Sequence, residues 1–346
     1  MRVGMLAPIS WRTPPRRYGP WEYATSLLTE ALVAGGVDVT LFATVDSETA
    51  GRLKAICPRP YSEDASLDPK VWEALHVAYA FEHARDFDIL HNQADFIPLG
   101  HSRLVETPVV TTIHGFSSPR ILPAFQAYDD RAFYVAISNA DRHPSLNYAA
   151  TIHHGIPLED FPFNAEGGEH LLFYGRIHPD KGAAEAVEAA RRTGHGLVMA
   201  GIVHDEDYFR REVEPHIDGQ RVVYPGAVGG VDRGRMLGGA KALLHLINFN
   251  EPFGFSVIEA LACGTPVIAI RRGSMAELIE DGVTGFLVNS LEEAVDAIGR
   301  IGEIDRRTCR AAAEKRFSVE RMAREYQALY RAILEGAIRP TTNTPG

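Results

Sequence analysis

The stretch Leu171-Leu-Phe-Tyr-Gly-Arg-Ile-His-Pro-Asp-Lys-Gly182 joins a short apolar run to a loop that carries a glycine and two cations. Its first four residues predict a buried strand, and the apolar spacing over Ala183–Thr193 predicts the helix that follows. Arg176 and Lys181 would stand at the entrance to that helix, where arginine binds phosphate oxygens bidentately and lysine adds a point charge. The loop therefore suits a diphosphate. An ordinary strand-to-helix loop with two solvated cations is the alternative.

Strand-length apolar runs alternate with helix-length amphipathic runs through both halves of the chain. In the first half, strands are predicted at Val3–Ala7, Val37–Ala43, Phe87–His91, Val109–His114, Phe133–Ile137 and Thr151–His153. In the second half, further strands are predicted at Leu197–Ala200, Val222–Tyr224, Ala242–Leu246, Val267–Ile270 and Phe286–Val288. Solid apolar strands separated by helices are typical of parallel sheets covered on both faces. The sequence therefore predicts an α/β chain of two doubly wound, Rossmann-like domains, with ligands bound outside the carboxyl ends of the strands.

The break between the two series lies where Pro157, Pro162 and the glycines of Glu166–Glu169 interrupt both periodicities. We expect a first domain over residues 1–160 and a second over residues 165–317. The tail, residues 336–346, is polar and rich in proline and threonine, so we expect it to be disordered.

Charge and cysteine usage exclude several classes of protein. The 346 residues carry a formal net charge of −10, and both halves are acidic. This argues against nucleic acid as a partner and leaves at most a peripheral membrane contact. The three cysteines are scattered and odd in number, which favours a reducing, cytoplasmic compartment. His153-His154 has no third ligand at metal spacing, and the pair Asp86 and Asp88 precedes a predicted strand, on the wrong edge for a site, so neither a metal ion nor a cofactor is expected.

A second constellation, Glu251-Pro-Phe-Gly-Phe-Ser-Val-Ile-Glu259, sets two carboxylates eight positions apart. The proline and glycine between them exclude helix from the first part, so Glu251 is predicted on a loop and Glu259 in the first turn of the next helix. N–H groups at that helix start would be open to an anion or a sugar hydroxyl. Carboxylates accept hydrogen bonds from vicinal hydroxyls, so Glu251 suits a sugar ring and Glu259 a ribose. For Glu259 the alternative is structural, because Ser256-x-x-Glu259 has the spacing of a capping box.

Four motifs in series carry a resemblance to a known family. They are Gly175-Arg176 with Lys181-Gly182, the pair Glu251 and Glu259, Gly264-Thr-Pro-Val-Ile268, and Gly273-Ser-Met-Ala-Glu277. Their order and spacing resemble the donor site of glycosyltransferase family 4, a group of retaining enzymes with the GT-B fold. The resemblance implies two Rossmann-like domains that face each other across a cleft. It also implies a last helix, about 318–335, that crosses back to the first, acceptor-side domain.

The resemblance implies roles for individual residues. Arg176 and Lys181 would neutralise the donor diphosphate, while Glu251 would bind the transferred sugar. Glu259 would bind the ribose. The remaining donor contacts, mostly through the backbone, would come from Gly175, Val228, Phe253, Gly254, Phe255 and Ser256. Glu277 matches a frequent acid of the last motif and is a candidate contact to the sugar or the acceptor.

The first half matches the family at fewer positions. Gly19 stands where similar proteins often carry Gly-Gly, with the backbone near the donor phosphate or the acceptor. Here Pro20 replaces the second glycine and has no N–H to offer. His114 ends a predicted strand and matches a histidine that often faces the transferred sugar, although a lone histidine is more often structural. Ser138 ends the next strand and is a further candidate contact to the sugar or the acceptor.

The predicted site holds cations for a leaving diphosphate and a carboxylate for sugar hydroxyls, but no obvious pair of carboxylates to flank the anomeric carbon. We therefore expect a metal-independent, front-face transfer of a hexose-type sugar from a nucleotide-diphosphate sugar, with retention of configuration. The residues expected nearest the chemistry are Arg176, Lys181, Glu251 and His114. The acceptor stays open: a glycan, a small molecule or a lipid-linked sugar. A nucleotide-sugar epimerase and a non-catalytic nucleotide-sugar-binding protein are the alternatives.

Overall fold

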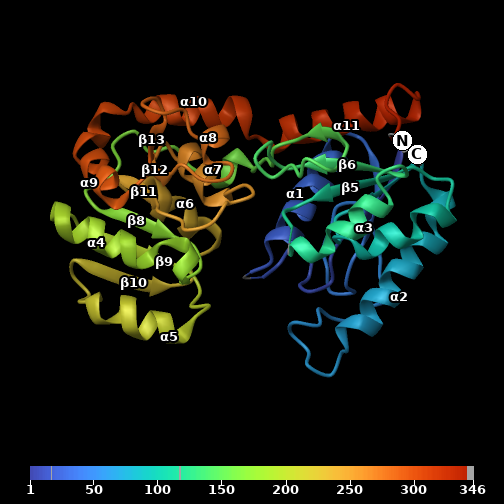
Figure 1. Ribbon diagram of the computed structural model, residues 1–346, viewed down its shortest axis with the longest axis horizontal. Coiled ribbons are helices and arrows are strands. Elements are labelled where there is room, and N and C mark those ends of the chain that lie inside the picture. Colours follow the sequence, from blue (N-terminus) through green and yellow to red (C-terminus); the bar gives the residue numbers. More distant parts are fainter. Residues whose placement is uncertain (17, 117, 341–346) are drawn as a thin grey trace. The chain divides into compact units, whose positions relative to one another are not determined.

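The computed structural model describes residues 1–16, 18–116 and 118–340, and the chain divides into two compact units (Figure 1). The first unit comprises Met1–Gly155 together with the chain from Val319 on, and the second comprises Ile156–Ser318. Each unit has its own parallel sheet, as expected for solid apolar strands. The predicted α/β fold of two Rossmann-like units is confirmed.

The sheet of the first unit has the strand order β3-β2-β1-β4-β5-β6-β7, and its neighbouring strands are parallel. Its strands are β1 (Arg2–Leu6), β2 (Asp38–Phe42), β3 (Arg52–Lys54), β4 (Ile89–Asn92), β5 (Val109–Ile113), β6 (Ala132–Ala136) and β7 (Tyr148–Thr151). The order reverses between β1 and β4, where Met5 is in register with His91. Such a switch point leaves a crevice at the carboxyl ends of the strands, where ligands bind.

Helices close the core of this unit. They are α1 (Pro20–Ala34), α2 (Pro69–Glu82), α3 (Leu122–Ala127) and α11 (Val319–Leu334), with 3₁₀ helices at Ala84–Asp86, Ile97–Leu104 and Pro119–Ile121. Although α11 lies far along the sequence, its Tyr326 and Tyr330 belong to the same buried core as Leu32 of α1. The Tyr330 hydroxyl also lies 2.6 Å from His91 Nδ1 on β4. The C-terminal helix therefore completes the first unit.

The sheet of the second unit has the order β10-β9-β8-β11-β12-β13 and is also parallel. Its strands are β8 (Leu171–Tyr174), β9 (Leu197–Ala200), β10 (Val222–Gly226), β11 (Ala242–His245), β12 (Val267–Ile270) and β13 (Gly285–Val288). The main helices are α4 (Ala183–Thr193), α5 (Glu206–Tyr208), α6 (Gly230–Gly238), α7 (Phe255–Ala262), α8 (Met275–Leu278), α9 (Leu291–Arg300) and α10 (Arg306–Arg316). Shorter turns of helix lie at Leu158–Asp160, Pro179–Lys181, Phe209–Val213, Glu214–His216 and Ile301–Glu303. Here the strand order reverses between β8 and β11.

The boundary between the units lies earlier than the sequence suggests. Ile156 already belongs to the second unit, where its N–H donates to Phe317 O at 2.8 Å. The segment expected to be a linker is bound by α10, because Arg306 donates from Nε to Asn164 O at 2.7 Å. The proline and glycine signals therefore mark an irregular segment that is held by the second unit.

Two edge strands and the tail also differ from expectation. The last strand of the first sheet occupies Tyr148–Thr151 rather than Thr151–His153, and β3 has no solid apolar run that would signal a buried strand. At the C-terminus, Ile338 packs against the core of the first unit, so the expectation of disorder over 336–346 is wrong at this position. Residues 341–346 lie outside the described residues.

Candidate active site

The Arg176 loop begins where β8 ends, at the carboxyl edge of the second sheet. Gly175 continues the strand ladder by donating its N–H to Ala200 O at 3.0 Å. The ends of β8 and β9 approach so closely that a Cβ on Gly201, whose φ is 149°, would lie 1.8 Å from Gly175 O. Only glycine fits at that point. Arg176 follows, half-buried, and it pairs with no carboxylate among the described residues, so its guanidinium is open to an anion.

The next part of the motif, the 3₁₀ turn Pro179–Lys181, is fastened to the loop after β11. Asn248 donates its backbone N–H to Asp180 O at 2.8 Å. Gly182 ends the turn with φ of 75°, and a Cβ there would lie 1.9 Å from Leu246 O. The glycine of the Lys-Gly motif is therefore required by a close approach of two backbones, which brings the lysine to the end of the neighbouring strand.

Lys181 and Glu251 form an ion pair across 70 positions of sequence. Their side chains are 16% and 13% exposed. The Lys181 ammonium also lies 4.6 Å from the centre of the Phe249 ring, and His245 Nε2 lies 3.6 Å from the same Glu251 oxygen. Burial by itself raises the pKa of the Glu251 carboxyl, but His245 and Lys181 outweigh it and hold that pKa at about 2. Glu251 is therefore ionised at neutral pH and can accept hydrogen bonds but not donate a proton.

The Gly273–Glu277 motif holds the Glu251 loop in place through hydrogen bonds. Ser274 donates its N–H to Glu251 O at 2.9 Å and its hydroxyl to Phe253 O. Gly273 has φ of 55°, and a Cβ there would lie 2.2 Å from Glu251 O. These contacts give the Gly-Ser pair a positioning role that sequence analysis did not assign. Glu277 lies in α8, half-buried, and its contact to the sugar or the acceptor stays a prediction.

The loop from Glu251 leads into α7, which begins at Phe255. Gly254 caps the helix with φ of 111° and without a side-chain hydrogen bond. The capping-box alternative is therefore wrong: the helix starts before Ser256, so this serine is not the N-cap and Glu259 lies beyond the first turn. A helix leaves its first N–H groups without partners inside the helix, so this turn keeps its predicted capacity for an anion or a sugar hydroxyl.

Glu259 is buried, 1% exposed, and forms an ion pair with Arg233 of α6 at 3.2 Å. Burial raises the pKa of Glu259, and Arg233 counteracts only part of that rise. Arg233 also lies over the Phe161 ring, 5.0 Å from its centre. At the end of β8, the Tyr174 hydroxyl donates to Val228 O at 3.1 Å, which fixes the backbone of Val228, one of the expected donor contacts. Burial, then Glu259, raises the pKa of Tyr174 to about 12, so this hydroxyl stays protonated.

Two residues of this edge were missed by sequence analysis. His245 is the last residue of β11, and its position at a strand end is the signal that could have identified it. Arg233 lies in α6 outside every motif, so its pairing with Glu259 leaves no trace in the sequence.

In the first unit, His114 follows β5 and joins a buried chain of hydrogen bonds. Its Nε2 lies 2.6 Å from Gln93 Oε1, so Nε2 carries the proton and donates it to that bond. Gln93 Nε2 lies 3.0 Å from His91 Nε2, and His91 in turn reaches Tyr330 of α11. Burial lowers the pKa of His114 to about 3, so the ring is neutral at pH 7. This network fixes the tautomer and the orientation of His114.

Two rings pack against His114. The other predicted residues of the first unit, Gly19 and Ser138, have structural contacts of their own. The rings of Trp21 and His154 stack on His114, with centroids 5.8 Å and 5.3 Å away. Gly19, with φ of 148°, caps the helix that carries Trp21. Ser138 is fully buried, and its hydroxyl accepts the N–H of a nearby turn, so its contact to a ligand stays a prediction.

Two further properties bear on the kind of site. Within the described residues, no group of three or more His, Cys, Asp or Glu side chains is arranged to hold a metal ion. Across the same ranges, no helix combines the length and the apolar character needed to cross a membrane.

Comparisons with known proteins find relatives among the glycosyltransferases. The family "Glycosyl transferases group 1" matches residues 158–316, which include the motifs of Arg176 and Glu251. Over its whole length the chain is 25% identical to a glycogen synthase of Mycobacterium tuberculosis, of which the match covers 98%. It is 26% identical to a phosphatidyl-myo-inositol mannosyltransferase of Propionibacterium freudenreichii, over 81% of this chain and 80% of that protein.

Solved structures share the fold. A sucrose-phosphate synthase from Thermosynechococcus elongatus matches with a TM-score of 0.79 and 19% identity, covering 97% of this chain and 100% of that one. Anabaena HepE in complex with UDP-glucose matches with a TM-score of 0.71 and 18% identity, covering 96% and 100%. The fold and these relatives together indicate a glycosyltransferase with the GT-B fold. Residues 158–316 match the group 1 glycosyl transferases, in agreement with the resemblance to family 4.

Proposed function

We propose that the protein transfers a hexose-type sugar from a nucleoside-diphosphate sugar to an acceptor hydroxyl, with retention of the anomeric configuration. The observation that carries this proposal is the buried Lys181–Glu251 ion pair at the carboxyl edge of the second sheet. Arg176 lies at the neighbouring strand end, and an arginine beside a lysine suits a diphosphate. HepE, which is similar in fold, is bound to UDP-glucose.

In the proposed reaction, Arg176 and Lys181 stabilise the charge that develops on the leaving diphosphate. Glu251, ionised because its pKa is about 2, accepts hydrogen bonds from hydroxyls of the transferred sugar. The departing phosphate oxygen takes the proton of the acceptor hydroxyl on the face that it leaves. The new glycosidic bond therefore forms on the side where the old bond breaks, and the configuration is kept. This scheme uses neither a metal ion nor a cofactor.

The nucleotide side of the donor is proposed to lie along the same edge. Glu259 would accept the ribose hydroxyls, and the backbone around Val228 would contact the base. Gly175 and the segment Phe253–Ser256 would contribute backbone groups to the phosphates and the sugar. The free and buried cysteines Cys57, Cys263 and Cys309 support a reducing, cytoplasmic location.

The alternative of a nucleotide-sugar epimerase finds less support. An epimerase needs an acid and a base that exchange protons around the sugar ring near neutral pH. The two candidates are Glu251, with a pKa of about 2, and His114, with a pKa of about 3. Both groups keep a single protonation state at neutral pH. A non-catalytic binder would be expected to have lost part of the site, whereas Arg176, Lys181, Glu251 and Glu259 all stand at one sheet edge.

The proposal is tested first by thermal unfolding in the presence of UDP-, GDP- and ADP-sugars. A donor that binds only the folded chain raises the unfolding temperature, so one of these classes is expected to do so. NMR of the transfer product then reads the anomeric configuration. Stabilisation by none of the donors, or an inverted product, would refute the proposal. Turnover of the donor in the absence of any acceptor, with a changed sugar, would identify an epimerase.

A further inference from the structure

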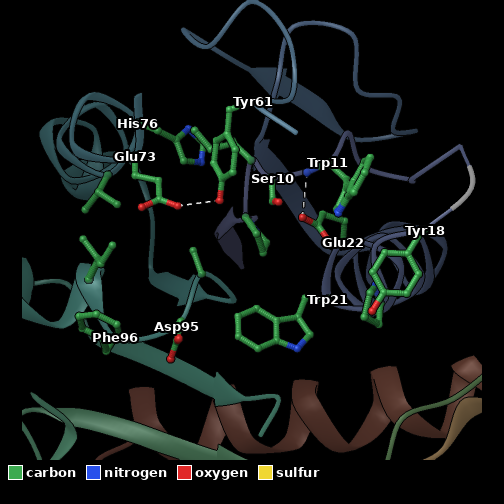
Figure 2. A pocket seen from close by; sticks show the side chains of 16 residues that line it. Ser10, Trp11, Tyr18, Trp21, Glu22, Tyr61, Glu73, His76, Asp95 and Phe96 are labelled. Atoms are coloured by element: carbon green, nitrogen blue, oxygen red, sulfur yellow. Dashed lines mark hydrogen bonds between the residues drawn. The ribbon is translucent and has the colours of Figure 1, made fainter. Parts of the chain in front are cut away.

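A cavity of about 590 Å³ opens in the first unit, at the carboxyl ends of β1 and β4 (Figure 2). Its wall comes from the loop after β1, the start of α1, one face of α2 and the loop after β4. Its volume is that of a pocket for a small molecule or a sugar ring. The donor-site motifs of the second unit contribute nothing to this wall, whereas Tyr18 and Pro20, the neighbours of Gly19, are part of it.

Aromatic side chains form much of the wall: Trp11, Tyr18, Trp21, Tyr61 and Phe96. Figure 2 shows these rings spread around the cavity rather than gathered in one cluster. Aromatic rings of this kind pack against the C–H faces of a ligand and, in tyrosine and tryptophan, add a polar handle. The wall therefore suits a ring that has both apolar faces and polar edges.

Three carboxylates complete the wall: Glu22, Glu73 and Asp95. Glu73 accepts the Tyr61 hydroxyl at 2.8 Å, which fixes the carboxylate. Asp95 has a left-handed backbone conformation, φ 59°, and Asn92 holds it there by donating from Nδ2 to Asp95 O at 2.8 Å. A non-glycine residue keeps such a conformation where its surroundings enforce it, often at a ligand site. Among the described residues of the wall there is no lysine or arginine.

The histidine of the wall, His76, carries no positive charge at neutral pH because it is buried. His76 lines the cavity at 1% exposure, and its Nε2 lies 3.0 Å from Ala7 O, so Nε2 carries the proton. Its Nδ1 has no partner among the described residues. Burial lowers the pKa of His76 to about 4, so the ring is neutral at pH 7. At neutral pH the part of the wall that the structure describes therefore offers acceptors and aromatic faces, but no cation.

The cavity adjoins the predicted catalytic histidine. Trp21 lines the cavity and also stacks on His114 at 5.8 Å. Only the Trp21 side chain would therefore separate a ring bound in the cavity from His114, the residue expected to face the transferred sugar.

Building on the proposed transferase function, we propose that this cavity binds the acceptor as an uncharged, polyhydroxylated ring, a neutral saccharide or polyol, and discriminates against the same ring carrying a phosphate. Hydroxyls would donate to Glu73 and Asp95 while the ring packs on the aromatic side chains. A phosphate dianion would meet like charges and find no cation to pair with among the described residues of the wall, which disfavours it. The sequence left open a glycan, a small molecule or a lipid-linked sugar as the acceptor. The cavity favours an acceptor that presents a neutral saccharide or polyol ring.

The test uses matched pairs of ring and phosphate ester: glucose and glucose 6-phosphate, mannose and mannose 6-phosphate, myo-inositol and myo-inositol 1-phosphate. Saturation-transfer NMR measures binding of each compound to the protein saturated with whichever of UDP, GDP or ADP stabilises it. At least one neutral member is expected to bind, and its phosphate ester to bind about tenfold more weakly or worse. Glu73→Lys should reduce or reverse this preference, because it places a cation in the wall. Glu82→Lys, on the exposed end of the same helix, is the matched control and should leave it unchanged.

Three outcomes would overturn the inference: a phosphate ester that binds as well as its parent, no binding by any neutral member, or a preference that Glu73→Lys leaves intact. Stabilisation by UDP, GDP and ADP is measured on the same samples by thermal unfolding. If one of these nucleotides still stabilises the chain, such an outcome removes only the acceptor class. If none of the three binds, the proposed function itself fails. A folded Glu73→Lys variant, with an unfolding temperature near that of Glu82→Lys, shows that any change is not a loss of structure.

Discussion

The two sheets share one strand order but carry opposite chemistry at their carboxyl ends. In each, the order reverses between the first strand and the fourth, β1 and β4 in one unit and β8 and β11 in the other. At the edge of the second sheet, Arg176 and Lys181 bring positive charge and glycines bring the backbones close together. At the edge of the first sheet, aromatic rings surround Glu73 and Asp95, and the buried histidine is neutral.

The difference teaches that topology decides where a ligand binds and that side chains at the strand ends decide which ligand. A parallel sheet offers its crevice in the same place whatever its sequence. We propose that the second edge binds an anionic donor, with Arg176 open to it and Lys181 held by the buried Glu251. The first edge is proposed to bind a hydroxyl-rich, uncharged ring. The following predictions test whether the two edges are as distinct as these residues imply.

The largest effect is expected from Lys181→Met. Loss of one charged donor to the leaving group typically costs about 10²–10³ in kcat, and the substitution also leaves Glu251 buried without its lysine. Steady-state transfer kinetics measure the loss. The KM for the acceptor should change little, since the acceptor cavity belongs to the other unit.

The matched control is Lys241→Met. Lys241 lies just before β11, at the opposite edge of the sheet, and pairs with the exposed Glu169. It should keep nearly full activity. A loss for Lys181→Met that is no greater than the loss for Lys241→Met would mean that the donor edge is not where the sequence and the geometry put it.

A smaller effect, on stability, is expected from Glu22→Gln in the wall of the first edge. Burial raises the pKa of Glu22 to about 7, against about 4.5 in an unfolded chain. Between these values the folded state binds more protons, so the stability of the wild type falls as pH rises from about 4.5 to about 7. The glutamine variant lacks this loss. Its free energy of unfolding should match the wild type near pH 4.5 and exceed it by about 3 kcal/mol at pH 8.

Urea unfolding of both proteins at a series of pH values measures this difference. Glu82→Gln, at an exposed position of α2, is the control and should track the wild type throughout. Parallel pH profiles for Glu22→Gln and the wild type would contradict the raised pKa of Glu22 and show that it is ionised in the fold, where it would add negative charge to the first edge.

The smallest effect is expected from Ser274→Ala, which tests how the donor edge is held. The buried hydroxyl donates to Phe253 O, and its removal leaves that carbonyl without this donor, at a cost of about 1–2 kcal/mol. If the loop then shifts, the KM for the donor rises by up to about tenfold. Ser145→Ala, at an exposed position of the first unit, should change neither quantity. An unchanged KM would assign Ser274 to stability alone.

Much of the proposed donor site, at the carboxyl edge of the second sheet, was predictable because its residues follow strands with clear apolar runs in the sequence. Leu171–Tyr174 and Leu197–Ala200 were predicted with the bounds that the structure has, and Arg176 follows directly from the first of them. The pairing of Lys181 with Glu251 was not predictable from spacing, because 70 residues separate them. A motif identifies its members one at a time, whereas the ion pair depends on strands β8 and β11 lying side by side.

The cavity at the carboxyl edge of the first sheet was not predictable from the sequence, for a related reason. Trp11, Tyr61, Glu73 and Asp95 come from four separate segments, and none of the segments has a period or a spacing that marks it. Local rules also failed where a shift of two residues in the helix start mattered. Ser256 has the spacing of a capping box with Glu259, but Gly254 starts the helix earlier and Glu259 pairs with an arginine instead.

The central claim, that the edge around Arg176 binds a diphosphate, is tested most directly by isothermal titration of UDP, GDP and ADP and of the matching nucleosides. The account predicts that one diphosphate binds, that its nucleoside binds much more weakly, and that Arg176→Met weakens the diphosphate about tenfold or more without changing the nucleoside. Equal affinities for diphosphate and nucleoside, both unaffected by Arg176→Met, would contradict it.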